Sequence, residues 1–285
     1  MKLVLVLALL SCALAAPALS AALLVQPEAV STAANDYNFS TSADERTAVF
    51  ARSAADFAQS KIYITERGRR GWKEPRLAPF SDSRWRDSDP WLTPDGGTLY
   101  FVSDRPTAAR PDKKDLDIWR SVKRKGRWSP PEHLGDVVNG RGEELGPELH
   151  AGVLYFATAR KSGHGGLDIY RAAQTGRGQF ASPELMPAPI NSAASESDFT
   201  LSRDGATAIF WRMVGERGLL HRSRLTPAGW SEPEVLPDTI NLGPFNFTPA
   251  LSPDGSRLTF ASTRPRAGQP AGLADVYETS LGSGR

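Results

Sequence analysis

A unit of about fifty residues repeats five times along this 285-residue chain and constrains its fold more than any other feature. In each unit an apolar, strand-like run ends in a phenylalanine, and these phenylalanines follow one another at spacings of 51, 55, 54 and 50 residues. They are Phe50, Phe101, Phe156, Phe210 and Phe260. Self-similarity at this period is typical of architectures in which neighbouring units stack and bury a shared core.

Each unit contains the signals for four strands. A short first segment such as DPWLT or TPALS is followed by a turn such as TPDGG or SPDGS and then by the phenylalanine strand. Asp-Gly between two apolar runs predicts a hairpin, because glycine supplies the positive φ that a tight turn needs. A third run, such as LDIWRS or LDIYRA, follows a variable loop, and a fourth lies around Trp72, Trp128, Phe180 and Trp230. Four antiparallel strands with short connections predict a propeller blade.

The fifth unit has no fourth strand after Tyr277, and the N-terminal segment offers a replacement. In units two to four a Pro-Glu pair is followed by an asparagine eight residues after its proline, as from Pro131 to Asn139. The N-terminal segment repeats this spacing from Pro27 to Asn35. We therefore predict that residues 23–30 form the outer strand of the fifth blade and close the ring, since an open array would leave sheet edges exposed.

The predicted fold is an all-β, five-bladed β-propeller of four-stranded antiparallel blades, closed by the N-terminal strand. We expect one propeller domain over residues 22–285. Its blades are placed at about 35–80, 85–138, 139–190, 191–240, and 241–285 together with 22–34. We expect the protein to be a monomer.

The first residues predict export from the cytoplasm. Lys2 precedes an apolar run over residues 3–10, and the small residues that follow suit a signal peptidase. The run is too short and too diluted to be a membrane anchor, which needs about 20 apolar residues. We expect residues 1–21 to be a signal peptide cleaved between Ala15 and Ala21, and the mature chain to be periplasmic or secreted, without a transmembrane span.

The single cysteine, Cys12, lies inside this segment. A chain cleaved after it carries no thiol and forms no disulfide, so that its fold rests on packing alone. The alternative is that LLSC is a lipobox and that Cys12 becomes the lipidated N-terminus of a lipoprotein.

Charge and motifs argue against several functional classes. The 34 basic and 32 acidic residues give a net charge of +2, without the basic cluster that phosphate backbones demand, so we expect no nucleic-acid partner. Four histidines leave no zinc-like spacing, and the chain lacks a G-x-S-x-G elbow and a glycine-rich phosphate loop before a helix. We therefore expect no metal, no cofactor and no catalytic nucleophile.

The segments TPDGGTLYFVSDR, SPDGSRLTFASTR and GGLDIYRA resemble the TolB-like propeller family, whose WD-like repeats carry a Pro-Asp-Gly turn followed by an apolar strand. The resemblance covers essentially the whole mature chain and implies a β-propeller. Such propellers occur in envelope proteins, beside peptidase domains and in carbohydrate enzymes, so the fold does not choose a function. The TolB family implies six blades and a separate N-terminal α/β domain, and this sequence departs from both expectations. A role in the Tol-Pal system is suggested by the family resemblance alone.

Acidic residues recur near the first strand of each blade, and an arginine follows each phenylalanine strand. The acids are Asp36, Asp87, Asp89, Glu143, Glu144, Glu196 and Asp198, with Asn246 in the fifth unit; the arginines are Arg52, Arg105, Arg160, Arg212 and Arg264. The first two strands form an antiparallel hairpin, so the start of one lies beside the end of the other. We predict a repeated ion pair at one mouth of the channel; the alternative is a carboxylate ring that binds a cation or a basic peptide.

The candidate ligand-binding residues combine this ring with aromatic residues that break the repeat. They are Asp89, Trp91, Glu144, Asp198, Trp211 and Arg212. Trp91 and Trp211 can stack on sugars or anchor peptides, or they can pack between blades. The variable loops between second and third strands lie on the same face, where Arg110, Lys113, Lys114, Lys161 and Arg266 predict a basic outer zone.

The sequence thus predicts a non-catalytic scaffold that binds a protein, peptide or glycan of the cell envelope. The alternative is a five-bladed glycoside hydrolase or lyase of the arabinanase type, with Asp89, Glu143 and Glu144 as candidate acids. Such hydrolysis needs two carboxyl groups about 5–9.5 Å apart, one of them kept protonated.

Overall fold

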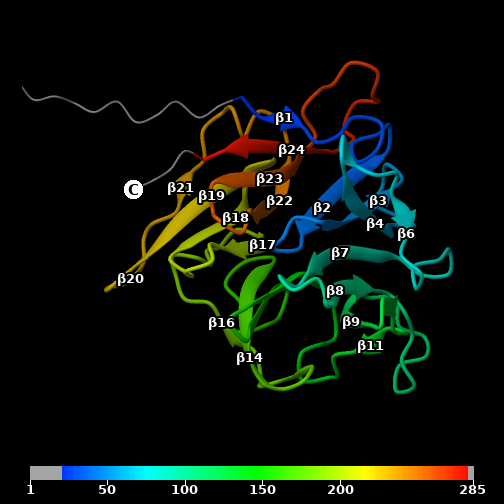
Figure 1. The fold of residues 1–285 in the computed structure, drawn as a ribbon. Helices are drawn as coiled ribbons and strands as arrows, with labels where there is room; N and C mark the ends of the chain where they lie inside the picture. Colours follow the sequence, from blue (N-terminus) through cyan, green and yellow to red (C-terminus); the bar gives the residue numbers. More distant parts are fainter. Residues whose placement is uncertain (1–20, 282–285) are drawn as a thin grey trace, which may run out of the picture.

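The computed structural model describes residues 21–281, which form strands, turns and loops in blades arranged around a common axis (Figure 1). This arrangement confirms the five-bladed β-propeller of antiparallel four-stranded blades. Within the described residues no helix is long and apolar enough to cross a membrane. Apart from Ala21, the predicted signal peptide lies outside the described residues, and Cys12 lies outside them with it.

The strands follow one another from the channel outwards in each blade. Blade one contains β2 (Asn35–Thr41), β3 (Thr47–Ser53), β4 (Lys61–Gly68), β5 (Gly71–Trp72) and β6 (Arg76–Leu77). Blade two contains β7 (Asp87–Leu92), β8 (Thr98–Ser103), β9 (Asp117–Arg124), β10 (Arg127–Trp128) and β11 (Glu132–His133). Blade three contains β12 (Glu144–His150), β13 (Val153–Thr158), β14 (Asp168–Gly176), β15 (Gln179–Phe180) and β16 (Glu184–Leu185).

Blade four contains β17 (Glu196–Leu201), β18 (Thr207–Val214), β19 (Arg217–Thr226), β20 (Gly229–Trp230) and β21 (Glu234–Val235). Blade five contains β22 (Asn246–Leu251), β23 (Arg257–Ser262), β24 (Asp275–Ser280) and β1 (Leu23–Leu24). In blades one to four the predicted fourth strand is divided into two short segments, both of which pair with the third strand.

The Asp-Gly turns join the first and second strands, as predicted. In the turn between β7 and β8, Asp95 Oδ1 accepts hydrogen bonds from the Thr93 hydroxyl at 2.6 Å and the Gly97 amide at 2.9 Å. Gly96 adopts a φ of 66°, a conformation that glycine reaches without steric cost. The turn residues therefore specify the hairpin locally, before any contact between blades is made.

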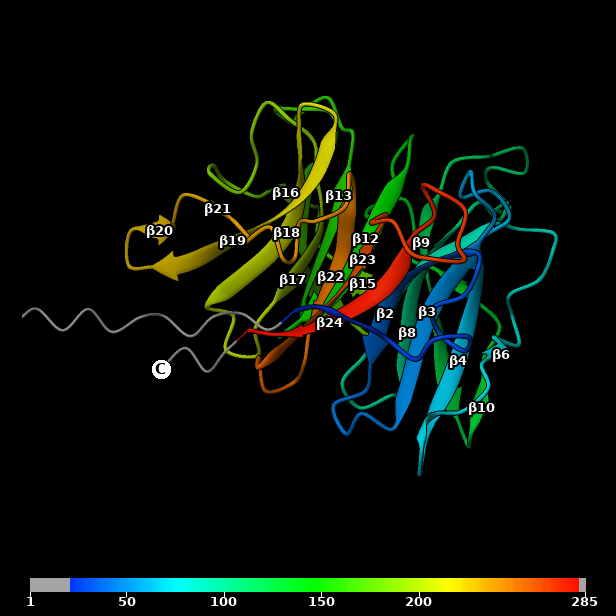
Figure 2. The ribbon, with the colours of Figure 1, turned by 90° about the horizontal axis from the view of Figure 1, so that it is seen from above.

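The N-terminal segment closes the fifth blade. Leu23 and Leu24 of β1 pair antiparallel with Glu278 and Tyr277 of β24, and the Val25 amide donates to the Val276 carbonyl at 2.9 Å. Figures 1 and 2 show the blue N-terminal segment beside the red strand β24. The regular strand is shorter than the predicted residues 23–30, because the chain turns after Val25.

The spacing from Pro27 to Asn35 predicted the closing strand, but Asn35 does not take the place that Asn139 has in blade two. Asn139 binds both backbone groups of Ile118, accepting from its amide at 2.7 Å and donating to its carbonyl at 3.2 Å. At the corresponding place in blade five, the Ser31 hydroxyl donates to the Val276 carbonyl at 3.1 Å. Asn35 instead begins β2. Ser31, four residues earlier in the chain, takes the position that the spacing gave to Asn35.

The repeated phenylalanines form the cores between blades. Each is at most 1% exposed. Phe101, for example, belongs to a cluster that joins Val49 and Ile62 of blade one to Leu99 of blade two. Each blade therefore buries its apolar face against its neighbour, which holds the five inner strands around the channel.

Candidate functional site

The channel is lined by the inner strands β2, β7, β12, β17 and β22, and each of them bulges in its middle. One residue in every bulge has a φ between 47° and 55°. These residues are Asn38, Asp89, Gly146, Asp198 and Thr248. Four of the five are not glycine, so the surrounding structure must hold an uncommon conformation in each blade.

The mouth at which the inner strands begin is held by arginine clips. Each clip joins an arginine near the end of the second strand to an acid at the start of the inner strand. The N···O distances are 2.6 Å for Arg52 and Asp36, 2.7 Å for Arg105 and Asp87, 3.3 Å for Arg160 and Glu144, and 2.7 Å for Arg212 and Glu196. In blade five, where Asn246 replaces the acid, Arg264 donates to the Ile240 carbonyl at 2.7 Å. The predicted ion pair is thus confirmed in four blades.

Two candidate ligand-binding residues belong to these clips. Glu144 is buried and accepts hydrogen bonds from the Gly140 amide and the Thr158 hydroxyl, each at 3.1 Å, as well as from Arg160. Arg212 also donates to the Ile190 carbonyl at 3.0 Å. Their hydrogen-bonding capacity is used to hold blades together at this mouth.

Trp211 packs between blades four and five. The residue is 8% exposed, and the centroid of its ring lies 5.4 Å from that of Phe245. This position agrees with the packing alternative for Trp211.

The predicted basic zone at the same mouth is wrong for three of its five cations. Arg110 and Lys113 fold back onto Asp117, and Arg266 binds Asp275 at 2.6 Å. Only Lys114 and Lys161 are exposed. These loops are therefore tied down by ion pairs within their own blades.

Three carboxyl groups lie deeper in the channel, one in each of blades two, three and four. Asp89 accepts a hydrogen bond from the Gly146 amide at 2.9 Å, and Asp198 accepts one from the Thr248 amide at 3.1 Å. Glu148 accepts one from the Leu201 amide at 3.1 Å. Each of these carboxyl groups thus accepts a hydrogen bond from a backbone amide of the next blade.

The three carboxyl groups border a small cavity of about 30 Å³, close to the volume of one water molecule. Gly146 makes this approach possible, because a Cβ at that position would lie 2.7 Å from Asp198 Oδ1. Among the described residues, no group of three or more His, Cys, Asp or Glu side chains is arranged to hold a metal ion.

Burial raises the pKa of all three channel carboxyl groups. For Glu148 it raises the pKa to about 7, against the opposing hydrogen bonds from the Leu201 amide, Thr200 and Trp91. The pKa of Asp198 is raised first by burial and then by the negative charge of Asp89, and burial also raises the pKa of Asp89. The channel therefore holds protonated carboxyl groups at a pH at which exposed ones are ionised.

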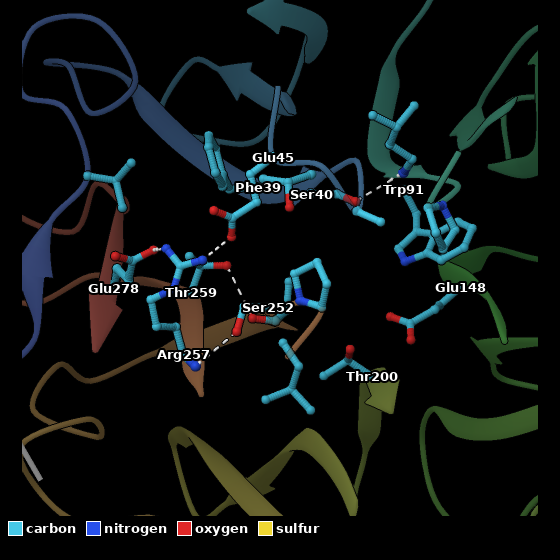
Figure 3. Close-up of a pocket in the computed structure, with 18 of the residues that line it drawn as sticks. Phe39, Ser40, Glu45, Trp91, Glu148, Thr200, Ser252, Arg257, Thr259 and Glu278 are labelled. Carbon is cyan, nitrogen blue, oxygen red and sulfur yellow. Dashed lines mark hydrogen bonds and ion pairs between the residues drawn. The ribbon is translucent and has the colours of Figure 1, made fainter. Parts of the chain in front are cut away.

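A cavity of about 650 Å³ opens at the opposite mouth, which we call the turn mouth because the Asp-Gly turns surround it. Figure 3 shows Trp91, Glu148 and Thr200 on one side of this cavity and Arg257 with Glu45 and Glu278 on the other. Arg257 forms ion pairs with both of those glutamates. The rings of Phe39 and Trp72, whose centroids lie 5.6 Å apart, also line the cavity.

The structure thus divides the predicted site residues. Trp91 lines the large cavity, Asp89 and Asp198 lie below it in the channel, and the other three lie outside both cavities. The large cavity is at the end of the channel opposite to the variable loops on which the sequence placed binding.

Sequence reasoning missed Glu148, although a signal for it exists. Pro147 precedes Glu148 in blade three as Pro90 precedes Trp91 in blade two, and both prolines lie in a bulge. Aligning the bulges would have placed Glu148 beside Trp91 in the channel. The hydrolase candidates Glu143 and Glu144 were wrong as partners of Asp89, because Glu144 is held in its clip and Glu143 binds Arg86 at 2.8 Å.

We expect Glu148→Gln to remove part of the pH dependence of stability. The folded-state pKa of about 7 lies above the usual 4.5, so neutral Glu148 contributes stability below about pH 4.5 that is lost as the pH rises through 7. This contribution amounts to about 3 kcal/mol for such a shift. The amide cannot ionise and keeps an acceptor for the Leu201 amide. Urea unfolding at pH 5 and pH 8 should show a smaller loss in the variant than in the parent.

The control for this experiment is Glu184→Gln, because Glu184 is exposed in a surface ion pair with Arg171. It should keep the parent's pH dependence. An unchanged difference between pH 5 and pH 8 in Glu148→Gln would contradict the assignment.

Comparisons with known proteins place the fold without assigning an activity. No family model matches the sequence, and a search of curated protein sequences found no match. Among solved structures, TolB from Acinetobacter baumannii is 14% identical, with a TM-score of 0.52 over 87% of this chain and 54% of its own, so this chain spans about half its length.

Two carbohydrate enzymes are similar over almost their whole length. The α-L-arabinofuranosidase from Lactobacillus brevis is 12% identical, with a TM-score of 0.55 over 87% of this chain and 90% of its own. A thermostable family-43 glycoside hydrolase is 12% identical, with a TM-score of 0.59 over 89% and 91%. At these identities the similarities establish a shared propeller, which supports the TolB-like resemblance at the level of the fold.

Proposed function

We propose that this protein is an exported, non-catalytic propeller that binds an envelope glycan in the cavity at the turn mouth. The export part rests on the N-terminal sequence. The observation that carries the binding part is the cavity of about 650 Å³, a volume within the range of about 300–1,000 Å³ that is usual for small-ligand sites.

The cavity walls suit a carbohydrate. Trp91 offers an aromatic face next to Glu148 and the Thr200 hydroxyl, all from inner strands of neighbouring blades. Sugars present apolar faces that stack on aromatic rings and hydroxyl groups that need several hydrogen-bond partners. At a pH below its pKa of about 7, Glu148 is protonated and supplies both a donor and an acceptor.

A glycoside hydrolase is the second candidate, and one observation favours it. Glu148 combines a pKa of about 7 with a place at the large cavity, as a general acid requires. Against it, Asp89 and Asp198 border only the cavity of about 30 Å³ and are bound to backbone amides of the next blades. The other carboxyl groups in the wall of the large cavity, Glu45 and Glu278, are both engaged in ion pairs with Arg257, which is why we propose binding.

The test is titration calorimetry of the mature protein with oligosaccharides prepared from envelope and plant polysaccharides. We expect a member of this set to bind, and Trp91→Ala to weaken its binding at least about tenfold through the loss of the stacking face. Trp85→Ala is the matched control, because Trp85 lies outside this cavity, and it should bind as the parent does.

Reducing-end release by the parent protein, abolished in Glu148→Gln, would replace the binding proposal with the hydrolase. Failure of every oligosaccharide to bind at millimolar concentration would contradict both candidates.

A further inference from the structure

A second cleft, of about 550 Å³, lies where blades one and two meet, and it shares no lining residue with the cavity at the turn mouth. We call it the tryptophan cleft, because Trp85, Trp119 and Trp128 line it. Phe80 also lines it and stacks on Phe101 with ring centroids 5.0 Å apart. Three of the seven tryptophans of the chain therefore gather at one site.

Trp119 carries a hydrogen-bond donor without a partner. The residue is only 8% exposed, and its Nε1 is buried with no acceptor among the described residues. At the same position of the third strand, the other blades have Tyr63, Tyr170, His221 and Tyr277. Buried donors are normally satisfied, so an orphaned N–H in the wall of a cleft indicates a place for the carbonyl oxygen of a ligand.

The other polar groups of the cleft are already bound. Arg84 donates a hydrogen bond to Asp82 at 2.6 Å. Arg105 donates to the Phe80 carbonyl at 2.6 Å and to Asp87 at 2.7 Å. The Ser129 hydroxyl accepts from the Val122 amide and donates to the Pro130 carbonyl. A sugar would bury many hydroxyl groups here without partners, which is costly.

A proline-rich segment fits the same walls. Proline has no N–H, so its backbone brings no donor that an apolar cleft leaves unpaired. The polyproline II helix is extended and free of internal hydrogen bonds, and aromatic-lined grooves bind it through ring faces and a few donors to its carbonyl groups.

A cationic hairpin tip lies at the end of the cleft. The tip is formed by residues 123–127, which include Lys123, Arg124, Lys125 and Arg127, all exposed. No ion pair engages any of them within the described residues. The Lys123 ammonium lies 5.7 Å from the centroid of the Trp128 ring, which places the tip beside the cleft. This charge is complementary to acidic residues in the ligand.

We propose that the tryptophan cleft binds a proline-rich segment of a partner protein, extended as a polyproline II helix and flanked by acidic residues that meet the 123–127 tip. The proposal does not depend on the glycan site.

Fluorescence anisotropy of two labelled synthetic peptides, EEEPPLPPLPP and PPLPPLPPEEE, tests it with the mature protein. We expect one orientation to bind with a Kd on the order of 100 μM or tighter. Trp85→Ala should weaken binding at least about tenfold, and Trp91→Ala should leave it unchanged. The Trp119 indole N–H resonance should move downfield on binding, as a new hydrogen bond forms.

Two further measurements separate the aromatic and electrostatic parts. Lys123→Glu with Lys125→Glu should weaken binding and reduce its dependence on salt, because these cations are exposed and their attraction is screened. A peptide with alanine in place of every proline should not bind. Melting curves of the variants establish that they are folded.

The proposal is overturned if neither peptide binds at 1 mM, or if Trp85→Ala binds as the parent does. It is also overturned if the alanine peptide binds equally well, or if an oligosaccharide occupies the cleft and displaces the peptide.

Discussion

Removal of residues 22–34 from the mature protein is expected to lower its melting temperature by at least about 10 °C or to prevent folding. Val30 is fully buried, in a cluster with Phe50 and Val276, and β1 covers the edge of β24. Arg52 would lose the Ala29 carbonyl, which it binds at 2.9 Å. The truncation thus opens the ring and exposes both a strand edge and an apolar blade face.

The truncated protein can be tested further with a synthetic peptide of residues 22–34. If the ring closes through this segment, the added peptide should raise the melting temperature of the truncated protein in a concentration-dependent way. Leu23→Asp is the point-variant control, because Leu23 is 71% exposed and should tolerate the change. A truncated protein that melts within about 2 °C of the parent would refute closure by this strand.

The second large effect is expected for Arg212→Ala, at about 3–5 kcal/mol of lost unfolding free energy. The side chain of Glu196 is fully buried and binds Arg212 at 2.7 Å, so the variant leaves a carboxylate without its cation. Adding Glu196→Gln should recover part of the loss, since a neutral amide needs no cation. Urea unfolding of the two variants measures both effects.

Arg171→Ala is the matched control, because Arg171 and Glu184 form an exposed pair at 3.2 Å. Its effect should stay below about 1 kcal/mol. A loss in Arg212→Ala no larger than that of the control would show that the clip does not hold the blades.

The clips and the channel carboxylates show how nearby acids on one strand take different roles. Asp87 starts β7 and binds Arg105, whereas Asp89, two residues later, lies at a bulge and binds the backbone of blade three. From the sequence both belonged to one acidic ring. The bulge separates them, because it changes the direction of the strand inside the channel.

The proposed glycan and peptide sites lie in separate cavities that share no lining residue. Trp91 lies on an inner strand and faces the turn mouth, while Trp85 lies in the linker between blades one and two. Opposite effects of Trp91→Ala and Trp85→Ala on the two ligands would separate the sites. A loss of both ligands in either variant would point to a change in the fold.

The sequence by itself determined the features that depend on local contacts. The Asp-Gly turns, the spacing of the phenylalanines and the incomplete fifth unit led to five closed blades, because hairpins form between residues close in the chain. The meeting of arginine and acid followed from the same hairpin geometry, as Arg212 and Glu196 illustrate.

Only the tertiary structure decided what the blades build together. The cavity at the turn mouth, the place of Glu148 and the tryptophan cleft all depend on side chains from different blades or linkers. The pairing of Arg110 with Asp117 likewise depended on how a loop folds back. Strand periodicity specifies which face a residue takes, but the packing of one blade on the next decides what that face meets.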